Sequence, residues 1–394
     1  MMTSLPLEGV RVIDITTVVY GPYATQILGD MGAEIIKIES PTGDDVRYIE
    51  PFGAEGLSAL YLGLNRNKRS VVLDLKSADG KEALWSLIAS ADILVHNMRT
   101  QKIRALGFGP EDVLAANPQM VFAELVGYGQ DGPLASLPAY DDVIQGQSGI
   151  AGSFMARDGA PALMPSIMAD KTSALMAVNL ILGAHIKKMQ TGRGVHIEVP
   201  MFESMVSFMM VEQLAGHTFD PPLGPMGYKR AVSPYRRAFK TSDGYLCMLA
   251  YHDGQWKKFW QIVGRPEIAD DERFLSMKAR SQHINELYAL VDEVMPSKTT
   301  AQWLQALQEA EIACGEVNSF EDLLEHEHLK EVGFFKVSAH KEAGRVRYVS
   351  PPGRIDGEHF PIGRAPSSLG ADTRDVLTEA GVETSVIERL CGDV

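Results

Sequence analysis

Short apolar runs alternate with amphipathic stretches along the first 126 residues of the chain. The pattern predicts strands at residues 9–15, 33–39, 70–75, 93–95 and 120–126, and helices at residues 23–31 and 80–90. The strand runs are rich in Val and Ile and show little alternation, which is typical of strands that are buried on both faces. Strands that alternate with helices favour a parallel sheet covered by helices, so the expected fold class is α/β. Ligands of such folds bind beyond the carboxyl ends of the strands.

The pattern changes in the second half of the chain. Helices are expected at residues 170–188 and 201–215, with a strand at 195–199 between them. Residues 216–237 carry four prolines and a basic cluster, which indicates a linker or a loop over a ligand. Strands at 238–241 and 245–250 followed by helices to about residue 324 indicate a second domain, and the tail is β-rich and then helical. We therefore expect a large domain from 1–215 and 330–394, a linker at 216–237, and a small domain at 238–329.

Composition excludes several classes of protein. The apolar fraction is 45% and the formal net charge is −14, which argues against general affinity for nucleic acids. Three cysteines are too few for a disulfide framework or a zinc site. His326 and His328 stand two residues apart, where helical side chains point to different faces, so no metal site is expected. Without a run of about 20 apolar residues or a signal-peptide pattern, no membrane association and a cytoplasmic location are expected.

A series of different short motifs is distributed along almost the whole chain. They read Gly9-Val10-Arg11-Val12-Ile13-Asp14, Gly29-Asp30-Met31-Gly32-Ala33-Glu34, Asn65-Arg66-Asn67-Lys68-Arg69-Ser70, Leu73-Asp74-Leu75-Lys76, His96-Asn97-Met98-Arg99, Gly127-Tyr128-Gly129-Gln130-Asp131-Gly132-Pro133, Tyr140-Asp141, Ala169-Asp170 and Ser233-Pro234-Tyr235. In this order and spacing they resemble the class III CoA-transferases, the CaiB/BaiF family that includes formyl-CoA transferase. The resemblance implies a large Rossmann-like domain made from both chain ends, a smaller inserted α+β domain, and a homodimer whose subunits interlock as rings.

The resemblance also implies a reaction and a set of site residues. Asp170 matches the nucleophile of a transferase that moves CoA between an acyl-CoA and a small carboxylic acid, through an aspartyl mixed anhydride and an aspartyl-CoA thioester. Read without the resemblance, Asp170 is an ordinary acid in the first turn of a helix. Coenzyme A is then substrate and product, and no permanently bound cofactor or metal is expected. The positions that match CoA contacts in the family are Val18, Val19, Leu73, Asp74, Leu75, Lys76, Asn97, Met98, Arg99, Arg104 and Tyr140.

Three other functions compete with this interpretation. The α-methylacyl-CoA racemases are similar, but they carry a histidine where Tyr140 stands, and a phenol with a pKa near ~10 is a poor base at neutral pH. An NAD-dependent dehydrogenase would suit the opening strand–helix–strand unit, but residues 16–22 lack the G-x-G-x-x-G pattern. A non-catalytic acyl-CoA-binding protein is the third. Arg236 and Arg237 would suit a dicarboxylic acceptor, although ordinary surface charge explains them equally.

Overall fold

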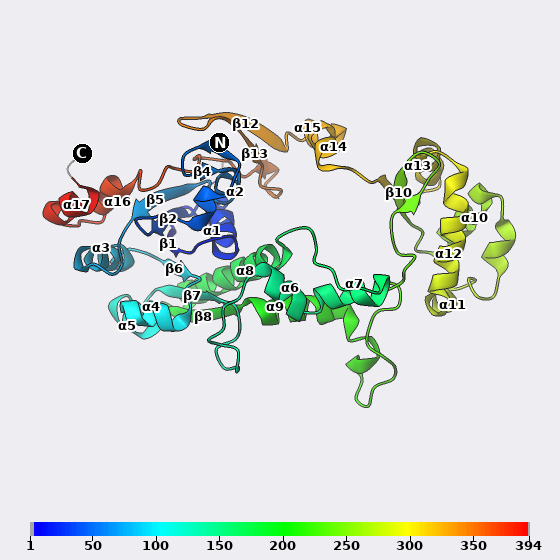
Figure 1. The fold of residues 1–394 in the computed structure, drawn as a ribbon, viewed down its shortest axis with the longest axis horizontal. Helices are drawn as coiled ribbons and strands as arrows, with labels where there is room; N and C mark the ends of the chain where they lie inside the picture. The colour runs from blue at the N-terminus through cyan, green and yellow to red at the C-terminus, as the bar shows by residue number, and fades with distance from the viewer. Residues whose placement is uncertain (1–3, 393–394) are drawn as a thin grey trace. The chain divides into compact units, whose positions relative to one another are not determined.

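The computed structural model describes residues 4–392 and contains a parallel sheet with helices on both faces (Figure 1). The sheet has six strands in the order β5-β2-β1-β6-β7-β8, and every neighbouring pair is parallel. Its strands are β1 (Arg11–Ile15), β2 (Glu34–Glu39), β5 (Lys68–Val72), β6 (Ile93–His96), β7 (Val121–Val126) and β8 (Val195–Pro200). The predicted mixed fold with a parallel central sheet is confirmed.

Two groups of helices bury the two faces of this sheet. One face packs on α3 (Ala78–Ala89), α4 (Thr100–Leu106), α5 (Pro110–Ala116) and the C-terminal helices α16 (Thr373–Glu379) and α17 (Thr384–Cys391). The other side carries α1 (Tyr20–Asp30) and α8 (Met168–Thr191), which contact each other and the strands. Figure 1 shows α16 and α17 near α3, so both ends of the chain build one core.

The first helix begins earlier than its sequence pattern predicts. The expected start was Tyr23, after Gly21 and Pro22, but α1 begins at Tyr20. Pro22 fits in the first turn because the backbone N–H that proline lacks has no partner there within the helix. Gly21 fits because a Cβ at this position would lie 2.2 Å from Cβ of Thr16. Glycine and proline here allow the helix to begin directly behind β1.

Two other boundaries shift in the same region. The strand predicted at 70–75 is β5 at Lys68–Val72, so Leu73 to Lys76 lie beyond its carboxyl end. Asp170 does not open its helix but lies in the first turn of α8, which begins at Met168. The strand is shifted by two residues at its start and three at its end, and the helix begins two residues early, as expected where propensity alone sets a boundary.

The chain divides into two compact units, and the second is smaller. It comprises residues 149–163 and 208–326, whereas the first comprises 1–148, 164–207 and 327–394. The expected division differs, because it assigned 149–163 and 208–215 to the large domain and 216–237 to a separate linker. The sequence predicted the helix α9 (Met201–Gln213) but not that the boundary between the units falls within it, and it predicted no helix at α7 (Ile150–Asp158).

The second unit has its own sheet and core. Its three antiparallel strands, in the order β11-β10-β9, are β9 (Phe239–Lys240), β10 (Tyr245–Leu249) and β11 (Ala313–Glu316). Its helices include α10 (Asp253–Val263), α11 (Met277–Gln282), α12 (Ile284–Val294), α13 (Thr300–Glu309) and α14 (Phe320–Glu325). Trp256, Trp260 and Trp303 fill the core between them.

Shorter elements complete the first unit. They are β3 (Phe52–Ala54), β4 (Leu57–Ser58), α2 (Ala59–Leu64), α6 (Asp141–Gln147), α15 (Glu327–Glu331), β12 (Phe335–His340), β13 (Gly344–Val349), β14 (Arg354–Ile355) and β15 (Glu358–His359). Among residues 4–392, no helix combines the length and the apolar character that crossing a membrane requires.

Candidate active site

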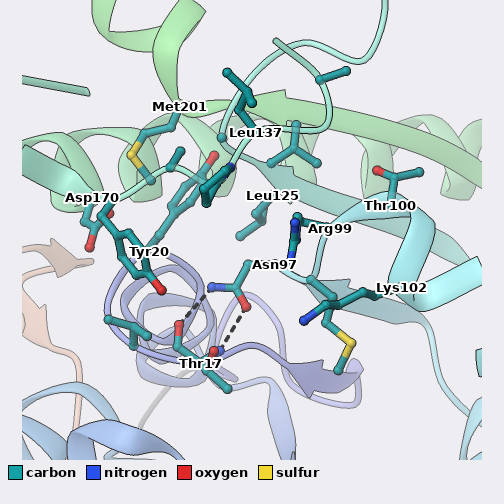
Figure 2. Close-up of a pocket in the computed structure, with 18 of the residues that line it drawn as sticks. Thr17, Tyr20, Asn97, Arg99, Thr100, Lys102, Leu125, Leu137, Asp170 and Met201 are labelled. Atoms are coloured by element: carbon teal, nitrogen blue, oxygen red, sulfur yellow. Dashed lines mark hydrogen bonds between the residues drawn. The ribbon is translucent and has the colours of Figure 1, made fainter. Parts of the chain in front are cut away.

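A cavity of about 340 Å³ lies beyond the carboxyl ends of β1, β6, β7 and β8. This is the edge of the sheet where parallel α/β folds bind their ligands. The residues that line it are Thr17, Val18, Tyr20, Asn97, Met98, Arg99, Thr100, Lys102, Leu125, Val126, Gly127, Gln130, Ala135, Leu137, Pro138, Ala139, Tyr140, Asp170 and Met201 (Figure 2). All of them belong to the first unit.

Asp170 contributes a carboxyl group to the lining of this cavity. The residue is only 7% exposed, and within residues 4–392 no donor forms a hydrogen bond to its carboxylate oxygens. Burial raises the pKa of this carboxyl to about 7, and the negative charge of Asp141 contributes in the same direction. Near neutral pH the group is therefore part carboxylate and part acid, and its carboxylate form is basic and poorly solvated.

Tyr20 lies beside Asp170 at this end of the cavity (Figure 2). Its hydroxyl donates to the backbone carbonyl of Val199 at 2.8 Å, so the hydroxyl proton does not form a hydrogen bond to Asp170. Burial and the charge of Asp170 raise the pKa of the phenol well above its ordinary value. Tyr20 therefore stays uncharged where it lines the cavity, and it leaves the carboxylate of Asp170 free for an incoming group.

The floor of the cavity is a tightly held turn at residues 16–18. Val18 has φ of 69°, a conformation that costs a β-branched residue about 1–3 kcal/mol. Its N–H donates to Oδ1 of Asp44, whose other oxygen accepts from Nζ of Lys37 at 3.1 Å, and that ammonium also donates to the Thr16 carbonyl. The Asn97 side chain accepts from the Thr17 N–H and donates to the Thr17 carbonyl. Side chains from two further strand ends thus fix this backbone.

The opposite end of the cavity is cationic. Figure 2 shows Arg99 and Lys102 at the far end from Asp170. Both side chains are exposed, and neither forms an ion pair or a side-chain hydrogen bond with another residue in 4–392. Arg104 differs, because its guanidinium is paired with Glu111 outside this cavity. Two uncommitted cations at one end and a buried carboxyl at the other suit a long ligand with an anionic tail.

The structure brings together about half of the site residues expected from the sequence. Those that line the cavity are Val18, Asn97, Met98, Arg99, Tyr140 and Asp170. Val19 is buried, Leu73 and Leu75 pack in the hydrophobic core, and Asp74 and Lys76 are exposed beyond β5. A role in catalysis or CoA binding stays a prediction for all of the expected site residues, whether or not they line the cavity.

Some features of the cavity were not predicted from the sequence. Tyr140, which matches a CoA contact in the family, is 66% exposed at the start of α6. Thr17, Gln130, Leu137 and Met201 line the cavity without having been assigned there. The signal that could have found them is their position, since each follows closely on the carboxyl end of a sheet strand or lies in the loop that leaves it.

Comparison with known proteins identifies the family. The sequence profile of CoA-transferase family III matches residues 7–373. The chain belongs to this family. A class III CoA-transferase is an enzyme that uses CoA thioesters as substrates, so this part of the prediction is confirmed.

Individual relatives of this class III CoA-transferase agree with the family assignment. It is 31% identical to a mouse (Mus musculus) succinyl-CoA:glutarate CoA-transferase over 98% of the chain and 89% of the relative. It is 32% identical to a succinate–glutarate CoA-transferase of Agrobacterium fabrum, over 86% of the chain and 87% of the relative. A crystal structure of a CaiB/BaiF family protein from Brucella suis superposes with a TM-score of 0.80 at 28% identity, covering 96% of this chain and all of that one. These names favour neither the racemase nor the dehydrogenase.

Proposed function

We propose that this class III CoA-transferase exchanges CoA between an acyl-CoA and a small acid through covalent intermediates on Asp170. One oxygen of the carboxylate attacks the thioester carbonyl carbon. The C–S bond breaks, and a mixed anhydride and the CoA thiolate result. The thiolate then attacks the aspartyl carbonyl, which releases the first acid as its carboxylate and leaves an aspartyl-CoA thioester.

The second half of the cycle reverses these steps with a new acid. The acceptor carboxylate attacks the aspartyl thioester, and the thiolate leaves again. It then attacks the acyl carbonyl of the new anhydride, so that the new acyl-CoA forms and the Asp170 carboxylate is restored. Each step breaks one acyl bond and forms another, with no net proton transfer, so the acyl group stays activated without ATP.

The observation that carries this proposal is the buried, unpaired carboxyl of Asp170 at one end of the cavity. A carboxylate that no donor stabilises is a stronger nucleophile than one held by hydrogen bonds, because its charge is not dispersed. The small accessible area also limits hydrolysis of both intermediates by water. Arg99 and Lys102 at the other end suit the phosphates of CoA, whose thiol lies at the far end of the pantetheine arm.

For the acceptor we propose a small dicarboxylic acid of the succinate or glutarate class. Two relatives over most of the chain length carry these acids in their names. Arg236 and Arg237, which the sequence offered for a second carboxylate, lie in the second unit, where Arg237 is paired with Asp292. Arg230 of the same unit donates to the hydroxyl of Tyr288. Arg236 is exposed, and among the described residues it has no ion-pair partner.

Trapping with hydroxylamine tests the nucleophile. Hydroxylamine added during turnover should convert Asp170 into a hydroxamate, a change that mass spectrometry of the digested protein can locate. Asp170→Ala should lose transfer by at least about 10³-fold, the scale of losing a covalent route, while acyl-CoA binding measured by calorimetry stays within a few-fold. Asp142→Ala, an exposed acid on α6, serves as the control. Near-normal turnover by Asp170→Ala, or a hydroxamate at another residue, would refute the proposal.

We also propose that the working form is a homodimer. Leu175, Leu182, Ile186 and Met189 fall at helical spacing along α8, and three of them are 50%, 54% and 72% exposed. An apolar stripe of this kind on a 24-residue helix is costly in water and suits an interface between subunits. The interlocked arrangement that the family resemblance implies is part of this proposal.

A further inference from the structure

The backbone that carries Asp170 is held by two side chains of α6. The N–H of Asp170 donates to Oδ1 of Asp141 at 3.0 Å, across 29 residues of sequence. The residue before α8, Ile167, has no side-chain acceptor, so Asp141 supplies the N-terminal cap that the local sequence lacks. Both Asp141 and Asp170 are less than 10% exposed, so this contact lies out of bulk water.

Gln145, one turn further along α6, completes the attachment. Its Nε2 donates to Oδ2 of Asp141 at 2.5 Å and to the Ser166 carbonyl at 3.1 Å, and its Oε1 accepts from the Met164 N–H. Gln145 is itself fully buried. Both oxygens of Asp141 therefore have partners, and the segment that leads into α8 is bound to α6 at three points.

We infer that Asp141 is a positioning residue for the nucleophile, holding the first turn of α8 and placing a second negative charge beside Asp170. This inference rests on the proposed role of Asp170. The charge has a direct effect on the reaction. When the Asp170 oxygen bonds to the thioester carbon and the C–S bond breaks, the negative charge leaves with the thiolate. Repulsion by Asp141 is present before this step and relieved after it, which favours the covalent intermediate.

Within residues 4–392, no other ionisable group on the elements that pack on α8 plays this part. The elements that pack most closely on α8 contribute Tyr20, Tyr23 and Asp30 on α1, Asp141 and Asp142 on α6, Glu124 on β7, and His196 and Glu198 on β8. Asp30 is paired with Arg66, Glu124 contacts His196, and Glu198 accepts from the Gln130 N–H. Lys171, the next residue along α8, donates to the hydroxyl of Ser166. Burial and Asp141 account for the raised pKa of Asp170.

The pH profile of kcat/KM separates a charge effect from a structural one. Asp141→Asn removes the charge and keeps one oxygen that can accept from the Asp170 N–H, while its NH2 group replaces the oxygen that accepts from Nε2 of Gln145. We expect the midpoint of its acid limb to move down by about one pH unit, with a several-fold lower plateau, because Asp170 becomes a weaker base. Asp141→Ala, which loses the acceptor as well, should lower the plateau by about a further tenfold. Asp142→Asn removes an exposed charge from the same turn of α6 and should leave the profile unchanged.

The outcomes are distinct. If Asp141→Asn and Asp141→Ala lower the rate and neither moves the acid limb, Asp141 is merely structural and the inference is wrong. Should Asp141→Asn not fold, Asp141→Ser, which is also a neutral oxygen acceptor, gives the same readout. Hydroxylamine trapping on each variant tests the nucleophile separately. A hydroxamate at Asp170 with an unmoved limb refutes only the role of Asp141, whereas no hydroxamate in the wild type refutes the proposed function itself.

Discussion

At the scale of single residues, the site is built around a charge that the fold disfavours. Burial is the main reason that the pKa of Asp170 rises from 3.8 to about 7 in the folded protein. Between these two pH values the carboxyl ionises in the unfolded chain but not readily in the folded protein, so its ionisation lowers the free energy of unfolding. This cost is absent below about pH 4 and complete above about pH 7. A carboxylate that stabilised the fold would show the opposite trend, as Asp14 does: burial alone would raise its pKa, but Lys68 and Lys37 lower it to about 2.

Replacing the nucleophile should therefore stabilise the protein in a pH-dependent way. Asp170→Asn has nearly the same shape and cannot ionise, so at pH 8 we expect its free energy of unfolding to exceed that of the wild type by about 1–4 kcal/mol. At pH 4.5, where the carboxyl of the unfolded chain is already mostly ionised, the difference should fall to roughly a quarter of its value at pH 8. Urea unfolding at both pH values and one protein concentration measures this, with Asp142→Asn as the exposed control. Equal stability of Asp170→Asn and wild type at pH 8 would mean that the carboxyl is better solvated than its surroundings indicate.

The cationic end of the cavity makes a second residue-scale prediction. Arg99→Gln and Lys102→Gln should each raise KM for acyl-CoA about 5- to 50-fold, the range expected when one partner of a phosphate contact is lost, with kcat changed little. The same variants should use an acyl-pantetheine, which lacks the nucleotide, as well as the wild type does. Arg104→Gln should have a smaller effect, since its guanidinium already pairs with Glu111. An equal rise in KM for all three variants would indicate that Arg104 also contacts CoA, as the family resemblance implies.

At the scale of elements, the turn between β1 and α1 depends on a buried ion pair. Lys37 on β2 and Asp44 are both fully buried, and together they hold Thr16 and the N–H of Val18. Asp44→Ala would leave the Lys37 ammonium without this partner, and we expect a loss of about 3–5 kcal/mol in the free energy of unfolding. The folded fraction should also show a lower kcat/KM, since Val18 forms part of the cavity wall. Chemical unfolding and steady-state kinetics measure the two effects.

Asp45→Ala offers a matched control for this element. Asp45 is the next residue, is exposed, and among the described residues has no ion-pair partner, so its replacement should change stability by less than about 0.5 kcal/mol. Comparable losses in Asp44→Ala and Asp45→Ala would show that the turn holds its shape without the ion pair.

Helices and strands also show which parts of the structure can be predicted from the sequence. Apolar runs predicted the strands of the parallel sheet, and the rule that ligands bind at strand carboxyl ends predicted the edge of the sheet where the cavity lies. Family resemblance named Asn97 and Arg99, which line this cavity. The same reasoning could not find Asp141 as the cap of α8 or Asp44 as the acceptor for Val18. Those contacts join residues 29 and 26 positions apart through loops, and only the packed fold decides which carboxylate meets which amide. Family resemblance marked Asp170, whereas its raised pKa follows from burial, which no local pattern contains.

At the scale of the whole molecule, the proposed dimer would link assembly to the proposed chemistry through α8. Its first turn carries Asp170, its inner face packs on α1 and the sheet, and its outer face carries the apolar stripe of Leu175, Leu182, Ile186 and Met189. A partner subunit that covers this stripe would also restrict motion of the helix that holds the nucleophile. Assembly and activity should therefore be lost together.

Ile186→Glu tests this link. A charge on the outer face of α8 should leave the isolated subunit folded, because Ile186 is 54% exposed, but it should disfavour a dry apolar interface. We expect light scattering to give a dimer mass for the wild type and a monomer mass for the variant, with transfer activity reduced at least about tenfold. Lys187→Glu, on a neighbouring exposed position, controls for added negative charge. A wild-type protein that is monomeric and fully active on dilution would exclude the dimer as the working form, and the stripe on α8 would then require another explanation.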